Sequence, residues 1–417
     1  MISRWQWIME KIYKKIWFRA TLFALAAIVT ALISIFFKSM IPLSFSMKVG
    51  AEAVDSILNI LASSMLAVTT FSLSIMVTAY GSATTNVTPR ATRLVVEDAT
   101  TQNVLATFIG SFLFSLVGII ALHMGAYGGR GRIILFAVTL VVIVLIVLTL
   151  LRWIQHLTAL GRVGETTAKV EQAALATFNA RAQNPCLGAS PWLKCDTQPA
   201  GTVAVCPECI GYIEHIDIGK LASFLTGSQV NVYLIGQPGS FVHPSQPVMY
   251  VTSNANSTIY SELLSALSVS DVRSFNQDPR FCLSVMAEIA CRALSPAVND
   301  PGTAIDVIGR GVRVLTVYGN QYAENGKVRY PAIHIAPLST SDLLDDFFSP
   351  IARDGAAMRE IQIRLLKGLA MLSHARPEFY ASTANAHARE ALHYIERENH
   401  IDSDNKLILE TYRNLFP

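Results

Sequence analysis

The chain has 417 residues, a formal net charge of +3 and only 15% charged residues. Its mean hydropathy is +0.40, which is too apolar for an ordinary soluble protein. The small net charge and the absence of a basic stretch interleaved with aromatic residues argue against nucleic acid as a partner. The apolar composition makes the lipid bilayer the expected partner.

Four apolar segments lie before about residue 155, at 20–37, 57–80, 104–122 and 133–151. A bilayer core of about 30 Å needs roughly 20 helical residues, so all four predict transmembrane helices, the first only just. The first segment resembles a signal peptide in its basic N-terminal flank. No cleavage site made of small residues follows Phe37, so we expect this segment to be retained.

Basic residues between these segments predict the orientation of the chain. They are more frequent before the first segment, after the second and after the fourth, which favours both termini in the cytoplasm. Residues 1–19 carry an apolar helical face with Trp5, Ile8, Ile12 and Ile16. This pattern predicts an interfacial amphipathic helix, and the alternative is a disordered basic tail.

The remaining chain divides by composition. We expect a four-helix transmembrane domain at 20–153, a connecting helix and cysteine-rich loop at 154–210, a small β-rich subdomain at 211–275 and a mainly helical subdomain at 276–417. Short strands are predicted at 211–216, 230–235 and 248–251, with a helix at 218–225 and one more extended piece at 328–335. The fold class is therefore membrane α-helical with a cytoplasmic α+β C-terminal domain.

The second apolar segment carries small and polar residues on one side. At about 100° per residue these fall within one face about 100° wide. They are Ser56, Asn59, Ser63, Ala67, Thr70, Ser74, Thr78 and Gly81. We expect this polar stripe to pack against a matching stripe on the third segment, made of Thr107, Ser111, Ser115 and Gly118.

The alternative interpretation is a water-filled path in an oligomer. Its pore-lining candidates are Asn59, Ser63, Thr70, Ser74 and Thr78. No charged residue lies in the middle of any span, which argues against a proton-relay pump but not against a passive pore. The loop after the second span adds Arg90, Arg93, Glu97 and Asp98, which are either a charged cytoplasmic mouth or interfacial anchors and helix caps.

The cysteine-rich loop contains four of the six cysteines, Cys186, Cys195, Cys206 and Cys209. Four thiolates in one loop are able to hold a structural zinc ion, although the spacing of the first pair is wider than usual. A redox-active pair at Cys206 and Cys209, or free thiols, are the alternatives. No other cofactor is expected.

Enzymatic motifs are absent: the sequence has no P-loop, G-x-G-x-x-G, H-E-x-x-H or G-x-S-x-G. We therefore do not expect an enzyme. The segment 292–304 predicts a helix end, a turn and a new helix capped by Asn299 or Asp300 before Pro301. The alternative is a contact site for a ligand or a neighbouring subunit, with the candidates Gln277, Asp278, Arg292, Ser295, Asn299 and Asp300.

Several motifs together resemble a known family. They are Pro89-Arg90 with Asp98, Gly211-Tyr212 with Asp217, Pro238-Gly239-Ser240-Phe241-Val242, the segment 277–281 and the segment 292–304. On these residues the chain resembles the bacterial predicted membrane proteins called domain of unknown function 2254 (DUF2254). It departs from the family pattern at Cys282, where a glycine is usual, and at Gly302, where a threonine is usual. The resemblance implies four spans and a cytoplasmic C-terminal domain, and it implies no activity.

Two functional hypotheses follow. The first is a homo-oligomeric ion channel or passive transporter, in which the second span lines the path and the cytoplasmic domain assembles or gates it. The second is a membrane-anchored sensor or scaffold that binds a ligand or partner through the cytoplasmic domain.

Overall fold

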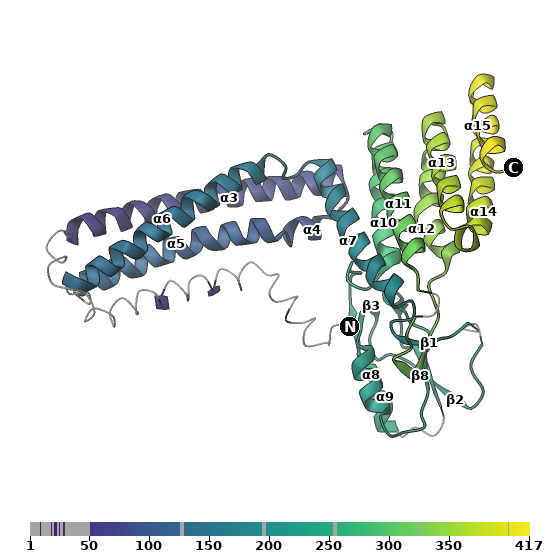
Figure 1. Cartoon of the computed structure of the whole chain (residues 1–417), viewed down its shortest axis with the longest axis horizontal. Coiled ribbons are helices and arrows are strands. Elements are labelled where there is room, and N and C mark those ends of the chain that lie inside the picture. Colours follow the sequence, from purple (N-terminus) through teal and green to yellow (C-terminus); the bar gives the residue numbers. More distant parts are fainter. Residues whose placement is uncertain are drawn as a thin grey trace. The chain divides into compact units, whose positions relative to one another are not determined.

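A computed structural model describes residues 51–125, 129–193, 197–252, 257–323, 326–398 and 400–417, together with a few isolated positions before residue 30 (Figure 1). The predicted interfacial helix and the predicted first span lie outside the described residues. The described chain forms two compact units. Residues 51–85 and 92–165 form the membrane unit, and residues 86–91 and 166–417 form the C-terminal unit.

The membrane unit contains three long helices and one short helix. They are α3 (Ala51–Asn86), α4 (Thr92–Val96), α5 (Ala99–His123) and α6 (Gly129–Leu157). The three long helices are long and apolar enough to cross a bilayer, as predicted for the second, third and fourth spans. At about 1.5 Å per residue, the 36 residues of α3 extend over about 54 Å, so this helix is longer than a bilayer core is thick.

Helix α5 is the most buried of the three. Phe114 packs in one cluster with Leu58 of α3 and Leu135 of α6, and Phe108 packs in a second with Met65 and Trp153. The indole of Trp153 also donates a hydrogen bond of 2.9 Å to Ser72 of α3. The core of the membrane unit therefore consists of apolar side chains from α3, α5 and α6.

The C-terminal unit contains most of α7 (Val163–Gln183) and two β-sheets. The larger sheet has the order β1-β8-β4-β6-β2, in which β8 is parallel to β1 and β4 while β6 is antiparallel to β4 and β2. Its strands are β1 (Ala189–Pro191), β2 (Thr202–Val205), β4 (Val232–Leu234), β6 (Met249–Thr252) and β8 (Tyr330–Ile335).

The smaller sheet is antiparallel with the order β5-β3-β7. Its strands are β3 (Gly211–Ile216), β5 (Phe241–Val242) and β7 (Leu267–Ser270), and helices α8 (Ile218–Leu225) and α9 (Ser257–Leu264) accompany them. One hydrophobic core joins both sheets, with Ile213, Met249 and Ile333 among its buried members.

Six helices complete the C-terminal unit: α10 (Pro279–Leu294), α11 (Pro301–Gln321), α12 (Thr340–Asp354), α13 (Arg359–Ala375), α14 (Pro377–Ile395) and α15 (Asp402–Leu415). They form two rows, because α12 packs between α10 and α14 while α13 packs between α11 and α15 (Figure 1). Helix α11 also packs against α10, and α14 against α13, so the rows cover each other's apolar faces.

The structure differs from the sequence prediction in the sheets. Strands β1 and β2 lie inside the segment predicted to be a loop, and β7 was not predicted. Strand β8, which follows two helices of the mainly helical segment, pairs with β1 and β4. These pairings join residues far apart in the chain, and a short strand has little local signal of its own.

Two glycines of α11 provide a test of this packing. A β-carbon at Gly311 would lie 2.1 Å from the ring of the fully buried Phe347, whereas at Gly309 it would meet only the end of the Arg364 side chain at 3.0 Å. We expect Gly311→Ala to lower the free energy of unfolding by about 1–3 kcal/mol through overpacking. Gly309→Ala should raise it by up to about 1 kcal/mol because alanine favours the helix. Thermal unfolding of the detergent-purified protein measures both; equal melting temperatures for the two variants would contradict the packing.

Candidate functional site

The polar stripe of α3 is exposed along its whole length. Ser56, Asn59, Ser63, Ala67, Thr70, Ser74, Thr78 and Gly81 are all exposed. The buried positions of α3 are Val54, Leu58, Leu61, Met65, Ser72, Met76, Ala79 and Ala83. At about 100° per residue, this packing face lies about 180° around the helix from the polar stripe. The helix therefore directs one apolar face to its neighbours and the polar stripe outward, where the stripe shares the exposed surface with Ile60 and Val77.

This arrangement corrects the expected pairing with the third span. Thr107, Ser111, Ser115 and Gly118 of α5 are buried, whereas the polar stripe is exposed, so the two faces do not pack together. A β-carbon at Gly118 would lie 3.1 Å from Leu58 and 3.7 Å from Leu135, which are apolar side chains of α3 and α6. Small residues on α5 thus make room for leucines, and the polar stripe is left without a partner among the described spans.

The polar groups of the stripe are bonded within α3. Ser63 and Thr70 donate hydrogen bonds of 2.9 Å to the carbonyl oxygens of Asn59 and Leu66, and Thr78 donates one of 3.0 Å to Ser74. The amide of Asn59 donates to the backbone and side-chain oxygens of Asp55 at 3.0 and 3.1 Å. The hydroxyl oxygens keep accepting capacity on the outer surface, because a hydroxyl has one donor and two lone pairs.

The candidate mouth residues Arg93, Glu97 and Asp98 are paired locally. Arg93 and Glu97 form an ion pair of 2.8 Å one helical turn apart. Asp98 caps α5 by accepting from the Thr101 backbone at 2.9 Å, and it lies 3.1 Å from the Nε2 of His156. These contacts fit anchors and caps, and a role in selecting ions stays a prediction.

Arg90, the fourth mouth candidate, belongs to the C-terminal unit. Residues 86–91 lie at the end of α3 and just after it, and two of them contact α10. Arg90 forms an ion pair of 2.9 Å with Glu288, and the Thr88 hydroxyl donates to the same carboxylate oxygen at 2.9 Å. The segment after the polar stripe is therefore attached to the first helix of the helical rows.

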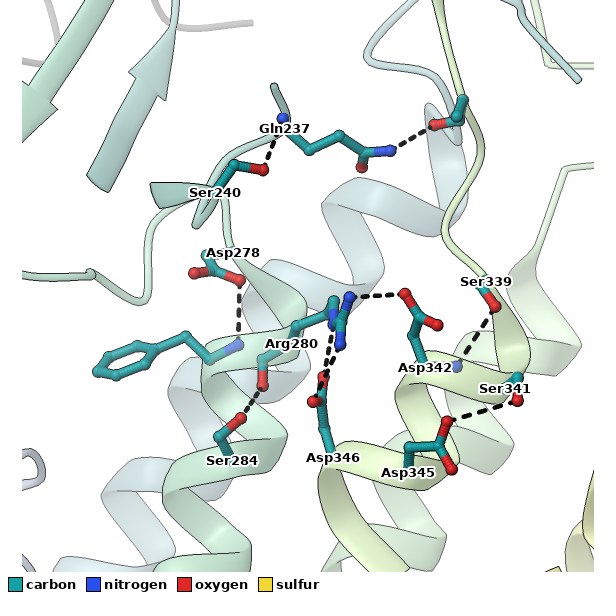
Figure 2. A network of polar contacts seen from close by, with 12 residues as sticks. Gln237, Ser240, Asp278, Arg280, Ser284, Ser339, Ser341, Asp342, Asp345 and Asp346 are labelled. Carbon is teal, nitrogen blue, oxygen red and sulfur yellow. Dashed lines mark hydrogen bonds and ion pairs between the residues drawn. The ribbon is translucent and has the colours of Figure 1, made fainter. Parts of the chain in front are cut away.

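Gln277 and Asp278 meet two other sequence motifs. The Gln277 side chain accepts from the Ile216 backbone at 2.9 Å, which fixes it to β3. Asp278 caps α10 and receives two hydrogen bonds from Arg273, at 2.7 and 3.0 Å. Gly239 has φ +92°, and a β-carbon there would lie 2.1 Å from Asp278. Figure 2 shows Asp278 close to Ser240, the residue that follows Gly239. Burial raises the pKa of Asp278, and Arg273 opposes that rise.

A buried cation that the sequence analysis missed lies nearby. Arg181 of α7 is 2% exposed and donates one hydrogen bond of 2.8 Å to Gln237. Its Nε and Nη1 atoms and the buried Tyr318 hydroxyl have no hydrogen-bond partner among the described residues. Burial lowers the pKa of Arg181, while Tyr318 and Cys186 oppose this effect. The sequence predicted a connecting helix in this region, but no local signal marked Arg181 as buried.

A partly open pocket of about 320 Å³, which the sequence did not predict, lies beside the smaller sheet. Its walls are mostly apolar and come from β3, β5, β7 and α9, with Ile213, Val242 and Val269 among them. Glu208 and Cys209 lie at the polar part of its lining. The volume and the few polar groups are typical of small-molecule pockets.

The cysteines of the loop have different surroundings. Cys186 is buried and Cys206 and Cys209 are exposed, while Cys195 lies outside the described residues. Burial raises the pKa of the Cys186 thiol, and Arg181 opposes that rise. Within the described ranges these three sulfurs do not form a group close enough to share an ion. The structural zinc ion stays a prediction.

The segment 292–304 forms the predicted corner between two helices. Asp300 rather than Asn299 caps α11, accepting from the Thr303 backbone at 3.0 Å, and Pro301 occupies the first turn. Ser295 closes α10 by donating to the Arg292 carbonyl at 2.7 Å. Asn299 adopts φ +49° on an exposed turn. The corner is structural as predicted, and its alternative role as a contact site remains untested.

The Asp300 cap should depend on pH. Hydrogen bonds from Thr303 lower the pKa of Asp300 below its unfolded value of about 3.9, so its contribution is present above that pH and is lost as pH falls through the folded pKa. We expect Asp300→Ala to lower the melting temperature at pH 7, by the equivalent of about 1 kcal/mol. The gap should narrow as the pH falls below about 4, because the protonated carboxyl accepts more weakly. Asp300→Asn, which keeps a capping oxygen but not the charge, should lie between wild type and Asp300→Ala at pH 7; a neutral Asp300→Ala at pH 7 would refute the cap.

Comparisons with known proteins agree with the resemblance in the sequence. The family model described as "Predicted membrane protein (DUF2254)" matches residues 13–371. Curated relatives include the uncharacterized proteins MT1328 of Mycobacterium tuberculosis (strain CDC 1551 / Oshkosh) and Mb1321c of Mycobacterium bovis (strain ATCC BAA-935 / AF2122/97). Each is 26% identical over 236 residues, covering 52% of this chain and 43% of the relative.

The chain thus spans less than half the length of these relatives. No solved structure matches the chain. Since the family model covers most of the sequence, and three described helices are suited to a bilayer, the chain belongs to the DUF2254 family of predicted membrane proteins.

Proposed function

We propose that this protein is a homo-oligomeric channel or passive transporter of the bacterial inner membrane, in which the polar stripe of α3 lines the path. The termini would lie in the cytoplasm, and the C-terminal unit would assemble or gate the path without catalysing a reaction. The proposal rests on one observation: the polar stripe is directly opposite the packing face of α3 and is exposed throughout.

A second copy of the chain is the natural partner for this stripe. Side chains that face lipid have no physical reason to separate into a polar side and an apolar side. On α3 the flanks of the stripe carry exposed apolar residues, such as Leu66, Phe71 and Leu73, which suit lipid. Several copies arranged around one axis would place the hydroxyls toward that axis and the flanks toward neighbours and lipid.

The end of α3 supports a regulatory role for the C-terminal unit. The next residues along the chain, Thr88 and Arg90, bind Glu288 of α10. A displacement of α10 would therefore act on the segment that follows the proposed lining helix. The stripe contains no ionisable group in its middle, so the transport would be passive rather than coupled to protons.

Ion flux from proteoliposomes tests the path. The parent carries Cys206→Ser and Cys209→Ser, because these two thiols are exposed. We expect the parent to conduct a common inorganic ion, and Ser74→Cys to lose most of this flux when a charged, membrane-impermeant methanethiosulfonate is added. Leu73→Cys is the matched control: it is the adjacent exposed residue, about 90° from the centre of the stripe.

The control should keep its flux after the same treatment. The proposal would be overturned by a parent that conducts no common ion, or by equal sensitivity of the two cysteine variants. A strictly monomeric mass in detergent and in nanodiscs would overturn it too, since the stripe of one copy cannot enclose a path.

The 320 Å³ pocket supports a second candidate, a sensor that binds a small apolar molecule through the C-terminal unit. Its lining is mostly apolar, and Glu208, Ser261 and Ser265 add polar groups. These features suit a molecule with an apolar body and one polar end.

Mass spectrometry of the purified protein tests this pocket. We expect a small apolar molecule to copurify with wild type and to be lost from Val269→Trp, which fills the pocket. Val272→Trp, at a residue that is 58% exposed, should retain it. Equal retention by both variants, or no bound molecule in wild type, would count against the sensor.

A further inference from the structure

Helices α12 and α14 bring three ligating side chains together. His387 of α14 is 6% exposed, and its Nε2 lies 2.8 Å from Oδ1 of Asp345 on α12. Glu390 follows His387 by three residues and therefore lies on the same face of α14. One ligand atom from each of the three residues lies within 4.8 Å of the other two.

The hydrogen bonds around His387 determine which ring nitrogen carries a proton. Its Nδ1 lies 2.9 Å from the carbonyl oxygen of Thr383, which can only accept, so Nδ1 donates. In the neutral ring Nε2 then presents a lone pair, and it faces a carboxylate oxygen that is also an acceptor. Two acceptors 2.8 Å apart need a shared electrophile, which is either a proton or a metal ion.

The arginine of the neighbouring helix α10 is paired with two other carboxylates. Arg280 of α10 binds Asp342 at 2.6 Å and Asp346 at 2.6 and 3.1 Å, on either side of Asp345 in the sequence. Figure 2 shows Asp345 directed away from Arg280 and toward Ser341. In the described part of the chain, neither Asp345 nor Glu390 forms an ion pair with a lysine or an arginine. The two carboxylates thus lie close together without a balancing guanidinium or ammonium group.

We propose that Asp345, His387 and Glu390 bind a divalent transition-metal ion. Two ligands that are each about 2.1 Å from such an ion, at right angles, are about 3.0 Å apart, close to the 2.8 Å between Nε2 and Oδ1. A ligating histidine ordinarily donates its other ring N–H to a carbonyl or carboxylate, as Nδ1 does here to Thr383. One imidazole with two carboxylates suits Zn²⁺, Mn²⁺, Fe²⁺ or Co²⁺ rather than a soft thiophilic ion.

The site would join the middle and last helices of one row. Asp345 comes from α12, and His387 and Glu390 come from α14, so a bound ion would cross-link two neighbouring helices of the C-terminal unit. The Tyr394 hydroxyl donates a hydrogen bond of 3.3 Å to Oε1 of Glu390, which would orient this carboxylate. This inference stands independently of the proposed path through the membrane.

Cobalt binding tests the site. Untagged full-length protein with Cys206→Ser and Cys209→Ser, which removes the two thiols that are exposed among the described residues, is titrated with Co²⁺ in detergent. We expect a visible d–d absorption band that saturates at one ion per chain and disappears when Zn²⁺ is added. A site of nitrogen and oxygen ligands should give no sulfur-to-cobalt charge-transfer band in the near ultraviolet.

Three variants locate the binding. His387→Gln and Glu390→Gln should each weaken Co²⁺ binding by about tenfold or more and abolish the rise in melting temperature that the ion causes. His393→Gln is the matched control, because His393 is on the same helix and its side chain is 75% exposed. It should bind Co²⁺ as the parent does.

Two results would contradict the metal site. If the parent binds Co²⁺ no better than Glu390→Gln, the histidine and Asp345 share a proton and there is no metal site. If His387→Gln does not fold, Glu390→Gln carries the test alone, because Glu390 is only partly buried and its replacement keeps the size of the side chain. A sulfur-to-cobalt band would place the ion on the remaining cysteines and overturn the assignment.

Discussion

The apolar face of α3 determines the rest of the membrane unit. Leu58, Met65 and Met76 are buried on this face, and Leu58 fills the space that Gly118 leaves on α5. Because side chains on opposite sides of a helix cannot meet the same neighbour, burying these residues fixes the polar stripe on the outside. Any explanation of the stripe must therefore involve something other than the three described spans, and a second copy of the chain is the partner that we propose.

Paired charges join the elements of the C-terminal unit. One ion pair, between Asp278 and Arg273, lies at the start of α10. A second set joins α10 to α12, through Arg280 with Asp342 and Asp346. A third pair, between Glu288 and Arg90, attaches the segment after α3. Each of these pairs matches a carboxylate with a guanidinium, which can form two parallel hydrogen bonds. The contact between α12 and α14 uses Asp345 and His387 instead, and this difference in chemistry is the reason that a metal ion fits there.

Local signals allowed the sequence to predict much of the fold. Asp300 before Pro301 marked the start of α11, the bounds of β3 and α8 matched those predicted, and long apolar segments located three spans. The contacts that depend on distant residues escaped prediction. Asp345 and His387 are 42 residues apart, and Arg181 is buried by sheets and helices that follow it in the chain. For the same reason, periodicity identified the polar stripe but not which face of α3 its neighbours would cover.

The chemistry of the stripe constrains what a path along it could select. Charged groups near the ends of the long helices include two acidic side chains that are engaged there: Asp55 contacts Asn59 and lies 3.7 Å from His123, and Asp98 pairs with His156. Between them the stripe offers hydroxyl oxygens whose donors are already bonded within the helix. Oxygen dipoles without formal charge attract cations more weakly than a carboxylate ring would, and they impose no need for a proton. A path along α3 would therefore discriminate chiefly by the width set by its small residues, and control of that width would fall to the segment held by Glu288.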